Sequence, residues 1–265
     1  MFCKSLYMIK KRRMHTLKLS YRLIVILFCL LNLAACSIQE RPSKEFAQRA
    51  SDSTLHALEK KYGIISNAHF ELFFERIVKR LSDSVETLRQ HSLDAPLNND
   101  FIPYTWNIHL INDSSINAFA LGGGHIAVTK MLFTQSPSEA AFVSVIAHEM
   151  AHELLGHTNE ALTLAMSNSN QTNTHYSLAQ ELAADELGVE LLSIARYNTQ
   201  HALDALTLGY RVSNEVVAGA PPDWLTIRSA KLYNLVLSKF MLSPATENSR
   251  EFTGLQRSLR KGLVR

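Results

Sequence analysis

The feature that most constrains this chain is a pair of histidines four residues apart, His148 and His152, with a glutamate between them. Residues four apart lie on one face of an α-helix, so a helical segment would turn both imidazoles toward one ion. Glu149 lies roughly 100° further round such a helix, where its carboxylate can act on water beside a metal without binding the metal. The spacing therefore predicts a helix that bears a metal site.

The residues before this pair favour a helix start. Ser136 is expected to cap the helix, Pro137 suits its first turn and Glu139 would complete a capping box, so we expect one helix over 137–158. Periodicity and breakers predict further helices at 44–61, 67–90, 178–195, 199–212 and 223–241, and short strands at 104–110, 116–121 and 126–129. The stretch 166–177 is polar and loop-like, and the tail 250–265 lacks a clear core pattern.

The N-terminal 36 residues predict export. They hold seven lysines and arginines and no acid, followed by an apolar run over 23–31 and then by Leu33-Ala34-Ala35-Cys36. This ending resembles a bacterial lipobox, which implies a signal peptide over 1–35, lipidation of Cys36 and a tether over 36–43. An ordinary signal peptide or an uncleaved anchor is the alternative. We expect one domain over 44–265 with its core at 104–241.

Charge and cysteine content exclude several classes of function. The chain carries 27 basic and 24 acidic residues, but without the first 36 residues the balance is four negative charges, so no nucleic-acid partner is expected. The three cysteines are Cys3, Cys29 and Cys36, which leaves the folded body without a disulfide or a thiolate. Any metal in that body must use histidine, aspartate or glutamate.

A catalytic zinc usually takes a third protein ligand. Leu155 and Thr158 occupy the places where an extended form of the motif has glycine and histidine, so that class is excluded. His157 lies roughly 140° from His152 on a continuous helix, so we expect a surface or second-layer histidine there rather than a ligand.

The next predicted helix offers better candidates for the third ligand. Glu181 and Asp185 are four apart, so one can bind the metal while the other orients a histidine. Glu186 and Glu190 also share a face, and spacing alone does not decide between the pairs.

Three separate segments, 148–157, 181–188 and 117–126, together resemble peptidase family M48, the gluzincins of the HtpX, Oma and prenyl-endopeptidase types. The resemblance spans about 105–230. It implies a mainly helical α+β domain of the zincin type, with a small sheet whose edge strand faces the active-site cleft. It also implies a zinc-dependent endopeptidase with one zinc ion per chain.

The resemblance also implies roles for particular residues. The zinc ligands would be His148, His152 and Glu181, with Glu149 as general base, Asp185 as the orienting carboxylate, Arg228 near the reacting atoms, and Asn117, Ala118 and Phe119 beside the substrate. One departure stands out, because many relatives carry His-Pro where this chain has Pro222 and Asp223. The role of that histidine would fall vacant or pass to His125, His175 or Arg228.

The expected substrates are proteins or peptides, in particular misfolded or misassembled envelope proteins, with the envelope assembly machinery as a possible partner. Ser37 rather than aspartate follows the predicted lipidated cysteine, which favours the periplasmic side of the outer membrane, where the lipid would hold the protein. The alternatives are a non-catalytic or chaperone-like zinc-binding lipoprotein module, and a metal-free helical lipoprotein with a chance motif.

Overall fold

The computed structural model describes residues 44–91, 97, 105–167, 176–213, 222–240 and 248–264. The predicted signal peptide, Cys36, the tether and His175 lie outside these residues. In chain order the elements are α2 (Lys44–Tyr62), α3 (Ala68–His91), β1 (Asn107–Ile111), β2 (Ala118–Gly122), β3 (His125–Thr129), α4 (Lys130–Gln135), α5 (Glu139–Leu154), α6 (His157–Ser167), α7 (Leu178–Ile194), α8 (His201–Ser213), α9 (Asp223–Leu235), the π-helical η2 (Val236–Phe240) and α10 (Arg250–Arg260).

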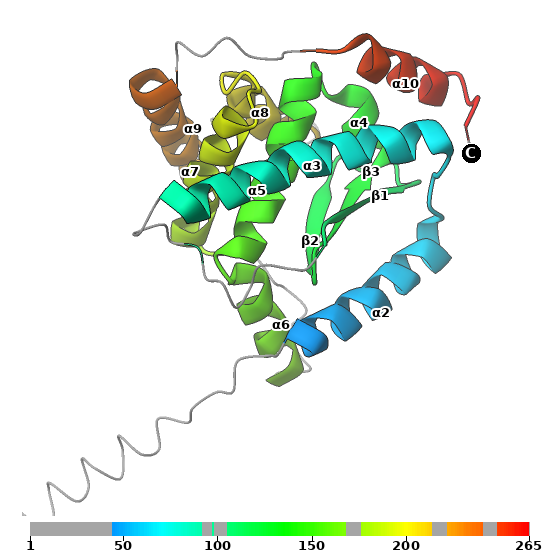
Figure 1. Cartoon of the computed structure of the whole chain (residues 1–265), viewed down its shortest axis with the longest axis horizontal. Coiled ribbons are helices and arrows are strands. Elements are labelled where there is room, and N and C mark those ends of the chain that lie inside the picture. The colour runs from blue at the N-terminus through cyan, green and yellow to red at the C-terminus, as the bar shows by residue number, and fades with distance from the viewer. Residues whose placement is uncertain are drawn as a thin grey trace, which may run out of the picture. The chain divides into compact units, whose positions relative to one another are not determined.

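The three strands form one mixed sheet in the order β1-β3-β2. β1 runs parallel to β3 with Asn107 opposite His125, and β2 runs antiparallel to β3 with Ala118 opposite Val128. β2 is therefore an edge strand, and α5 packs against it (Figure 1). The prediction of a mainly helical α+β domain with a small sheet is confirmed.

Each face of the sheet has its own apolar contacts. α2 covers one face, where Leu55 and Leu58 pack against Ile111 and Leu121. The other face joins the main core, which is built on α3, α5 and α7. Within the described residues no helix is both long enough and apolar enough to span a bilayer.

Six phenylalanines form the centre of the main core: Phe70, Phe73, Phe74, Phe133, Phe142 and Phe252. The rings of Phe133 and Phe142 meet edge to face with centroids 4.9 Å apart, an arrangement that suits the quadrupoles of aromatic rings. α10 contributes Phe252 to this cluster together with buried Leu255 and Leu259. The absence of a core pattern expected for 250–265 is therefore wrong, because these three apolar residues, spaced three and four apart among charged ones, form a narrow stripe.

The helix expected over 137–158 is two helices. α4 ends at Gln135 and the hydroxyl of Ser136 donates to the carbonyl of Leu132, so Ser138 rather than Ser136 caps α5. α5 then ends at Leu154, and Gly156 takes a left-handed conformation with φ 82° that only glycine adopts without strain. After this break, α6 begins at His157.

α7 approaches α5 closely, and a glycine makes the approach possible. A Cβ atom added at Gly188 would lie 3.2 Å from both the Cα and the backbone nitrogen of His148. Neither backbone atom can move without shifting α5. Gly188 therefore sets the distance between the two helices that carry the predicted metal ligands.

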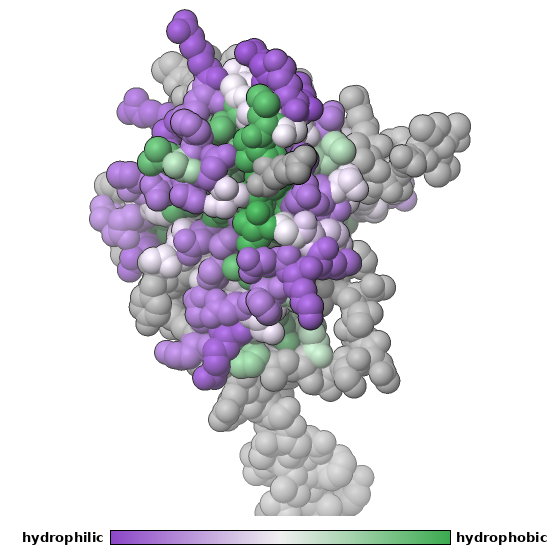
Figure 2. Space-filling model, turned by 90° about the vertical axis from the view of Figure 1, so that its right-hand side faces the viewer, coloured by the Kyte–Doolittle hydropathy of each residue, from purple (hydrophilic) through white to green (hydrophobic). Residues whose placement is uncertain are grey.

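The surface around the sheet's other edge is mainly hydrophilic. Figure 2 views the side of the molecule where β1 and α10 lie, and shows a narrow hydrophobic band among hydrophilic side chains. A cavity of about 350 Å³ lies between α3 and β1, lined in part by Phe74, Val78, Trp106 and Ile108.

We predict that Gly188→Ala lowers the free energy of unfolding by about 1–3 kcal/mol, because the added methyl group overpacks the contact between the two helices. Urea unfolding followed by circular dichroism measures the change. Gly254→Ala in α10 is the matched control, since a Cβ there meets nothing within 4 Å. The control should gain about 0.5–1 kcal/mol from helix propensity. Equal effects of the two substitutions would contradict the proposed role of Gly188.

Candidate active site

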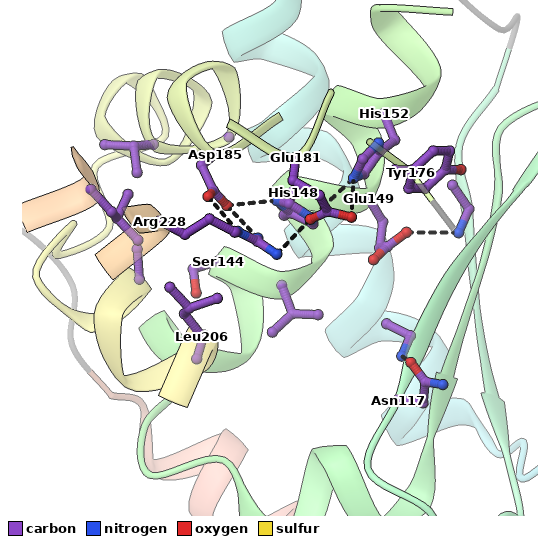
Figure 3. A pocket seen from close by; sticks show the side chains of 18 of the residues that line it. Asn117, Ser144, His148, Glu149, His152, Tyr176, Glu181, Asp185, Leu206 and Arg228 are labelled. Atoms are coloured by element: carbon purple, nitrogen blue, oxygen red, sulfur yellow. Dashed lines mark hydrogen bonds and ion pairs between the residues drawn. The ribbon is translucent and has the colours of Figure 1, made fainter. Parts of the chain in front are cut away.

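Three side chains from α5 and α7 converge on one point. The Nε2 atoms of His148 and His152 lie 3.0 Å apart, and the Glu181 carboxylate lies 3.4 Å from the first and 3.9 Å from the second. One donor atom from each of the three residues falls within 4.8 Å of the others (Figure 3). These residues form a group that can hold a metal ion, and two imidazoles with one carboxylate suit the donor preference of zinc.

The Nδ1 atom of each of these two imidazoles lies within hydrogen-bond distance of a polar side chain. The Oδ1 atom of Asp185 lies 3.1 Å from Nδ1 of His148, and Nδ1 of His157 lies 3.0 Å from Nδ1 of His152. When Nε2 faces a metal, Nδ1 carries the proton and can donate to these partners. Because α6 begins at His157, the turn at Gly156 brings this side chain back behind His152.

Arg228 ties α9 to the acidic residues of α7. Its Nε and Nη2 donate to the two carboxylate oxygens of Asp185 at 2.8 and 2.7 Å, and its Nη1 lies 2.5 Å from Oε2 of Glu181. The bidentate pair fixes the Asp185 carboxylate in a geometry that also serves His148. The three carboxylate and guanidinium groups therefore form one connected network.

Glu149 lies beside the edge strand. Its Oε2 accepts a hydrogen bond of 2.9 Å from the backbone N–H of Ala120, so that N–H faces the cleft and not β3. The side-chain oxygen of Asn117 accepts from the N–H of Ala118 at 2.9 Å. Asn117, Ala118 and Phe119 all line the cleft beside the metal group, as Figure 3 shows for Asn117.

Sequence reasoning missed Tyr176. Its ring stacks on that of His152 with centroids 3.8 Å apart and planes 16° from parallel, and its hydroxyl lies 3.3 Å from the hydroxyl of Thr158. A lone tyrosine in a polar stretch carries no periodic signal, so the sequence offered no reason to select it. The capping box of Ser177 and Gln180 starts α7 directly after Tyr176 and so fixes where this residue lies.

Burial and charge set the pKa values of the site. Burial alone would lower the pKa of His148, but hydrogen bonds to Asp185 and Glu181 raise it to about 9. Burial lowers the pKa of His152 to about 2, with the neighbouring His148 adding to the effect. Burial would raise the pKa of Asp185, but bonds to His148 and Arg228 bring it to about 2. Burial raises the pKa of Glu149 to about 7, partly offset by His148 and the Ala120 amide.

Of the three residues that could take the role of the family histidine, the structure describes two, His125 and Arg228. His125 bonds to His109 at 2.8 Å and to Gln48 at 2.9 Å, which places it under α2 and outside the residues that line the cleft. Arg228 does line the cleft. Pro222 itself is the residue before α9 and makes no side-chain cap.

Two histidines on one helix turn, a glutamate from a following helix that could join them on a metal, and a second glutamate beside an edge strand form the arrangement expected of a zincin-type metallopeptidase. Comparison with known families agrees, because the model of peptidase family M48 matches residues 78–172. The resemblance to peptidase family M48 is therefore confirmed over this segment. The matched segment contains both histidines and Glu149 but ends before Glu181.

Curated relatives match over shorter stretches. The chain is 34% identical over 105 residues to the putative beta-barrel assembly-enhancing protease of Vibrio cholerae, which covers 39% of this chain and 21% of that protein. It is 39% identical over 62 residues to the mitochondrial metalloendopeptidase OMA1 of Saccharomyces cerevisiae, which covers 23% of this chain and 18% of that protein. The chain thus spans about a fifth of the length of these relatives.

We predict that metal binding at this site releases a proton. The pKa of His148 is about 9 in the metal-free protein, so this imidazole is charged at pH 7 and must lose its proton to become a ligand. Zinc affinity should therefore rise about tenfold for each pH unit from 6 to 8. Calorimetry in buffers of different ionisation enthalpy measures the protons released.

Asp185→Asn is the matched control for this prediction, because it removes the charge that holds the proton on His148. The variant should release less than one proton at pH 7. A zinc affinity that is independent of pH in the original chain would contradict the charged state of His148.

Proposed function

We propose that this protein is a zinc-dependent endopeptidase in which Glu149 is the general base. The observation that carries the proposal is the position of Glu149 between the metal group of His148, His152 and Glu181 and the free edge of β2. An extended peptide that adds to this edge would lie across the metal group. The base, the ligands and the substrate strand would then meet at one point.

A zinc ion at this group would act as a Lewis acid and would lower the pKa of water. Glu149 takes the proton from the attacking water and passes it to the leaving amine. Asp185 and His157 keep the two imidazoles oriented, and Arg228 holds Asp185 in place. Asn117 and Ala118 present polar backbone and side-chain groups to the peptide.

We predict that Glu149→Gln binds one zinc ion per chain and loses peptidase activity by on the order of 10²–10⁴-fold, because the amide cannot accept the proton. Casein degradation and zinc content measure the two properties. Glu59→Gln, at an exposed position of α2, is the matched control and should keep full activity. Retained activity in the Glu149 variant would remove Glu149 from the role of base, and a zinc-loaded original chain that cuts nothing would favour a non-catalytic zinc-binding module.

We further propose that the protein acts on envelope proteins while held to the membrane by a lipid on Cys36. The sequence preceding Cys36 supports export and lipidation, and relatives named for beta-barrel assembly support a substrate among misassembled outer-membrane proteins. The body would then lie on the periplasmic side of the outer membrane, close to the assembly machinery. Trapping substrates with the Glu149→Gln variant tests the substrate class.

We predict that Cys36→Ser abolishes incorporation of labelled palmitate and moves the protein out of the membrane fraction, because serine offers no thiol for the lipid. Labelling in growing bacteria followed by fractionation measures both effects. Cys29→Ser, inside the apolar run of the predicted signal, is the control and should keep the label. Equal labelling of both variants would exclude Cys36 as the lipidated residue.

A further inference from the structure

The turn between β2 and β3 is built from three adjacent glycines, Gly122, Gly123 and Gly124, which the proposed chemistry does not use. All three have positive φ, at 91°, 59° and 83°. Gly123 and Gly124 are the central residues of the tight hairpin turn, and positive φ at both is typical of type I′ hairpins. Asparagine often takes the first central place in such turns, so backbone conformation alone does not explain the glycine at 123.

α2 lies directly against this turn. A Cβ atom added at Gly123 would lie 3.0 Å from the Cα atom of Gln48 and 2.8 Å from its Oε1 atom. The first of these contacts is to backbone, so a side chain at 123 would push α2 away. In Figure 1, α2 passes the end of the sheet at which β2 turns into β3, beside α6. The missing side chain of Gly123 therefore allows α2 to rest on the turn.

The side-chain amide of Gln48 continues this contact into the sheet. Its Nε2 atom donates to Nε2 of His125 at 2.9 Å and to Oδ1 of Asp52 at 3.1 Å. Nδ1 of His125 lies 2.8 Å from Nε2 of His109, and the two rings stack with centroids 5.0 Å apart. Because an amide nitrogen can only donate, His125 carries its proton on Nδ1 and donates it to His109. A chain of hydrogen bonds thus runs from α2 to β3 and β1.

Both imidazoles in this chain of hydrogen bonds are neutral at pH 7. Burial lowers the pKa of His109 to about 4, and the neighbouring His125 adds to the effect. Burial also lowers the pKa of His125, although the carboxylate of Asp52 opposes the change. The hydrogen bond between the rings requires a neutral acceptor, since an imidazolium ion offers only donors. The chain of hydrogen bonds is therefore intact at neutral pH.

On its other side, the turn is bonded to the helix that carries the two histidines of the metal group. The backbone N–H of Gly124 donates to Oε1 of Glu153 at 2.7 Å, and Glu153 directly follows His152 in α5. Only 3% of Glu153 is exposed, so water competes little for this bond. The turn is therefore held between two helices, by Gln48 from α2 and by Glu153 from α5.

The position of the turn bears on the position of the substrate edge. His125 pairs with Gly122, and Ala120, whose N–H lies 2.9 Å from Glu149, comes two residues earlier in β2. The register shifts at Leu121, where a bulge leaves one residue of β2 without its own partner on β3. A bulge disrupts the ladder locally, so contacts from outside the sheet are needed to fix where Ala120 lies.

We propose that Gln48 is a positioning residue for peptide binding, which holds the β2–β3 turn so that the edge of β2 lies where an extended peptide can pair with it across the metal group. The proposal rests on the endopeptidase function proposed above. Among the described residues that line the cleft, none comes from α2, so Gln48 acts only through the turn. Its loss should therefore weaken peptide binding more than it slows the chemical step.

The first test is the kinetics of Gln48→Ala, measured on the zinc-loaded protein with a fluorogenic peptide. We expect KM to rise at least fivefold while kcat stays within twofold, because the metal group and Glu149 keep their places. Ser249→Ala is the control, since it removes the cap of α10, which packs on α3 and α4. An unchanged KM, a fall in kcat that matches the rise in KM, or an equal rise of KM in the control overturns the proposal.

The bond between Gln48 and His125 makes a second test possible, because their substitutions should act on one path. His125→Ala alone should raise KM to a similar extent. Adding Gln48→Ala to it should raise KM by less than a further twofold, since both changes break the same chain of hydrogen bonds. Effects on KM that multiply in the double variant would mean that Gln48 acts elsewhere, and would overturn the proposal.

Hydrogen exchange separates this proposal from the endopeptidase function, because it needs no catalysis. In the zinc-loaded protein without peptide, the amides of residues 118–124 should exchange at least tenfold faster in Gln48→Ala than in the original chain, and at the original rate in Ser249→Ala. Equal exchange rates in this segment overturn the role of Gln48 even if the protein cuts peptides. If the original chain cuts no peptide, the endopeptidase function fails, and the exchange rates still decide whether Gln48 holds the edge of β2.

Discussion

The packing of α7 against α5 is the constraint on which the site depends. His148 and His152 come from one helix, and Glu181 and Asp185 from the other, so the ligand distances are set by how closely the two helices approach. Gly188 gives that approach, since its missing side chain leaves the backbone of His148 in contact. A metal site of this kind needs no local loop, because two rigid helices place all of its donors.

The charges of the site also explain why a divalent cation fits. Glu149, Glu181 and Asp185 lie close together in a region with little solvent, and Arg228 supplies one positive charge to them. Uncompensated carboxylates in such a place are costly. A dication beside neutral histidines would make this set of side chains electrically neutral, whereas a monovalent ion would leave an excess negative charge. The network of Arg228 and Asp185 thus serves both orientation and charge balance.

Much of the fold followed from local patterns, and the misses have physical causes. The residue spacing of the histidine motif, the capping signals and the alternation of the strands predicted element types that the structure bears out, whereas the helices α4, α6 and α10 were not predicted. The break at Gly156 was missed because Leu154 and Leu155 continue the apolar pattern. Tyr176 was missed because its position depends on stacking against the ring of His152, which comes from α5. Ring stacking between residues that are far apart in the sequence produces no periodic pattern in a single sequence.

The edge of β2 connects stability with the proposed chemistry. An open strand edge invites unwanted pairing, and here the two outward N–H groups of Ala118 and Ala120 are occupied by the side chains of Asn117 and Glu149. A peptide that adds to this edge competes for the same N–H groups. Displacing Glu149 from Ala120 would free the carboxylate that is proposed to accept the proton. Substrate pairing would then release the base, so the proposed activity of Glu149 would depend on the presence of an extended peptide.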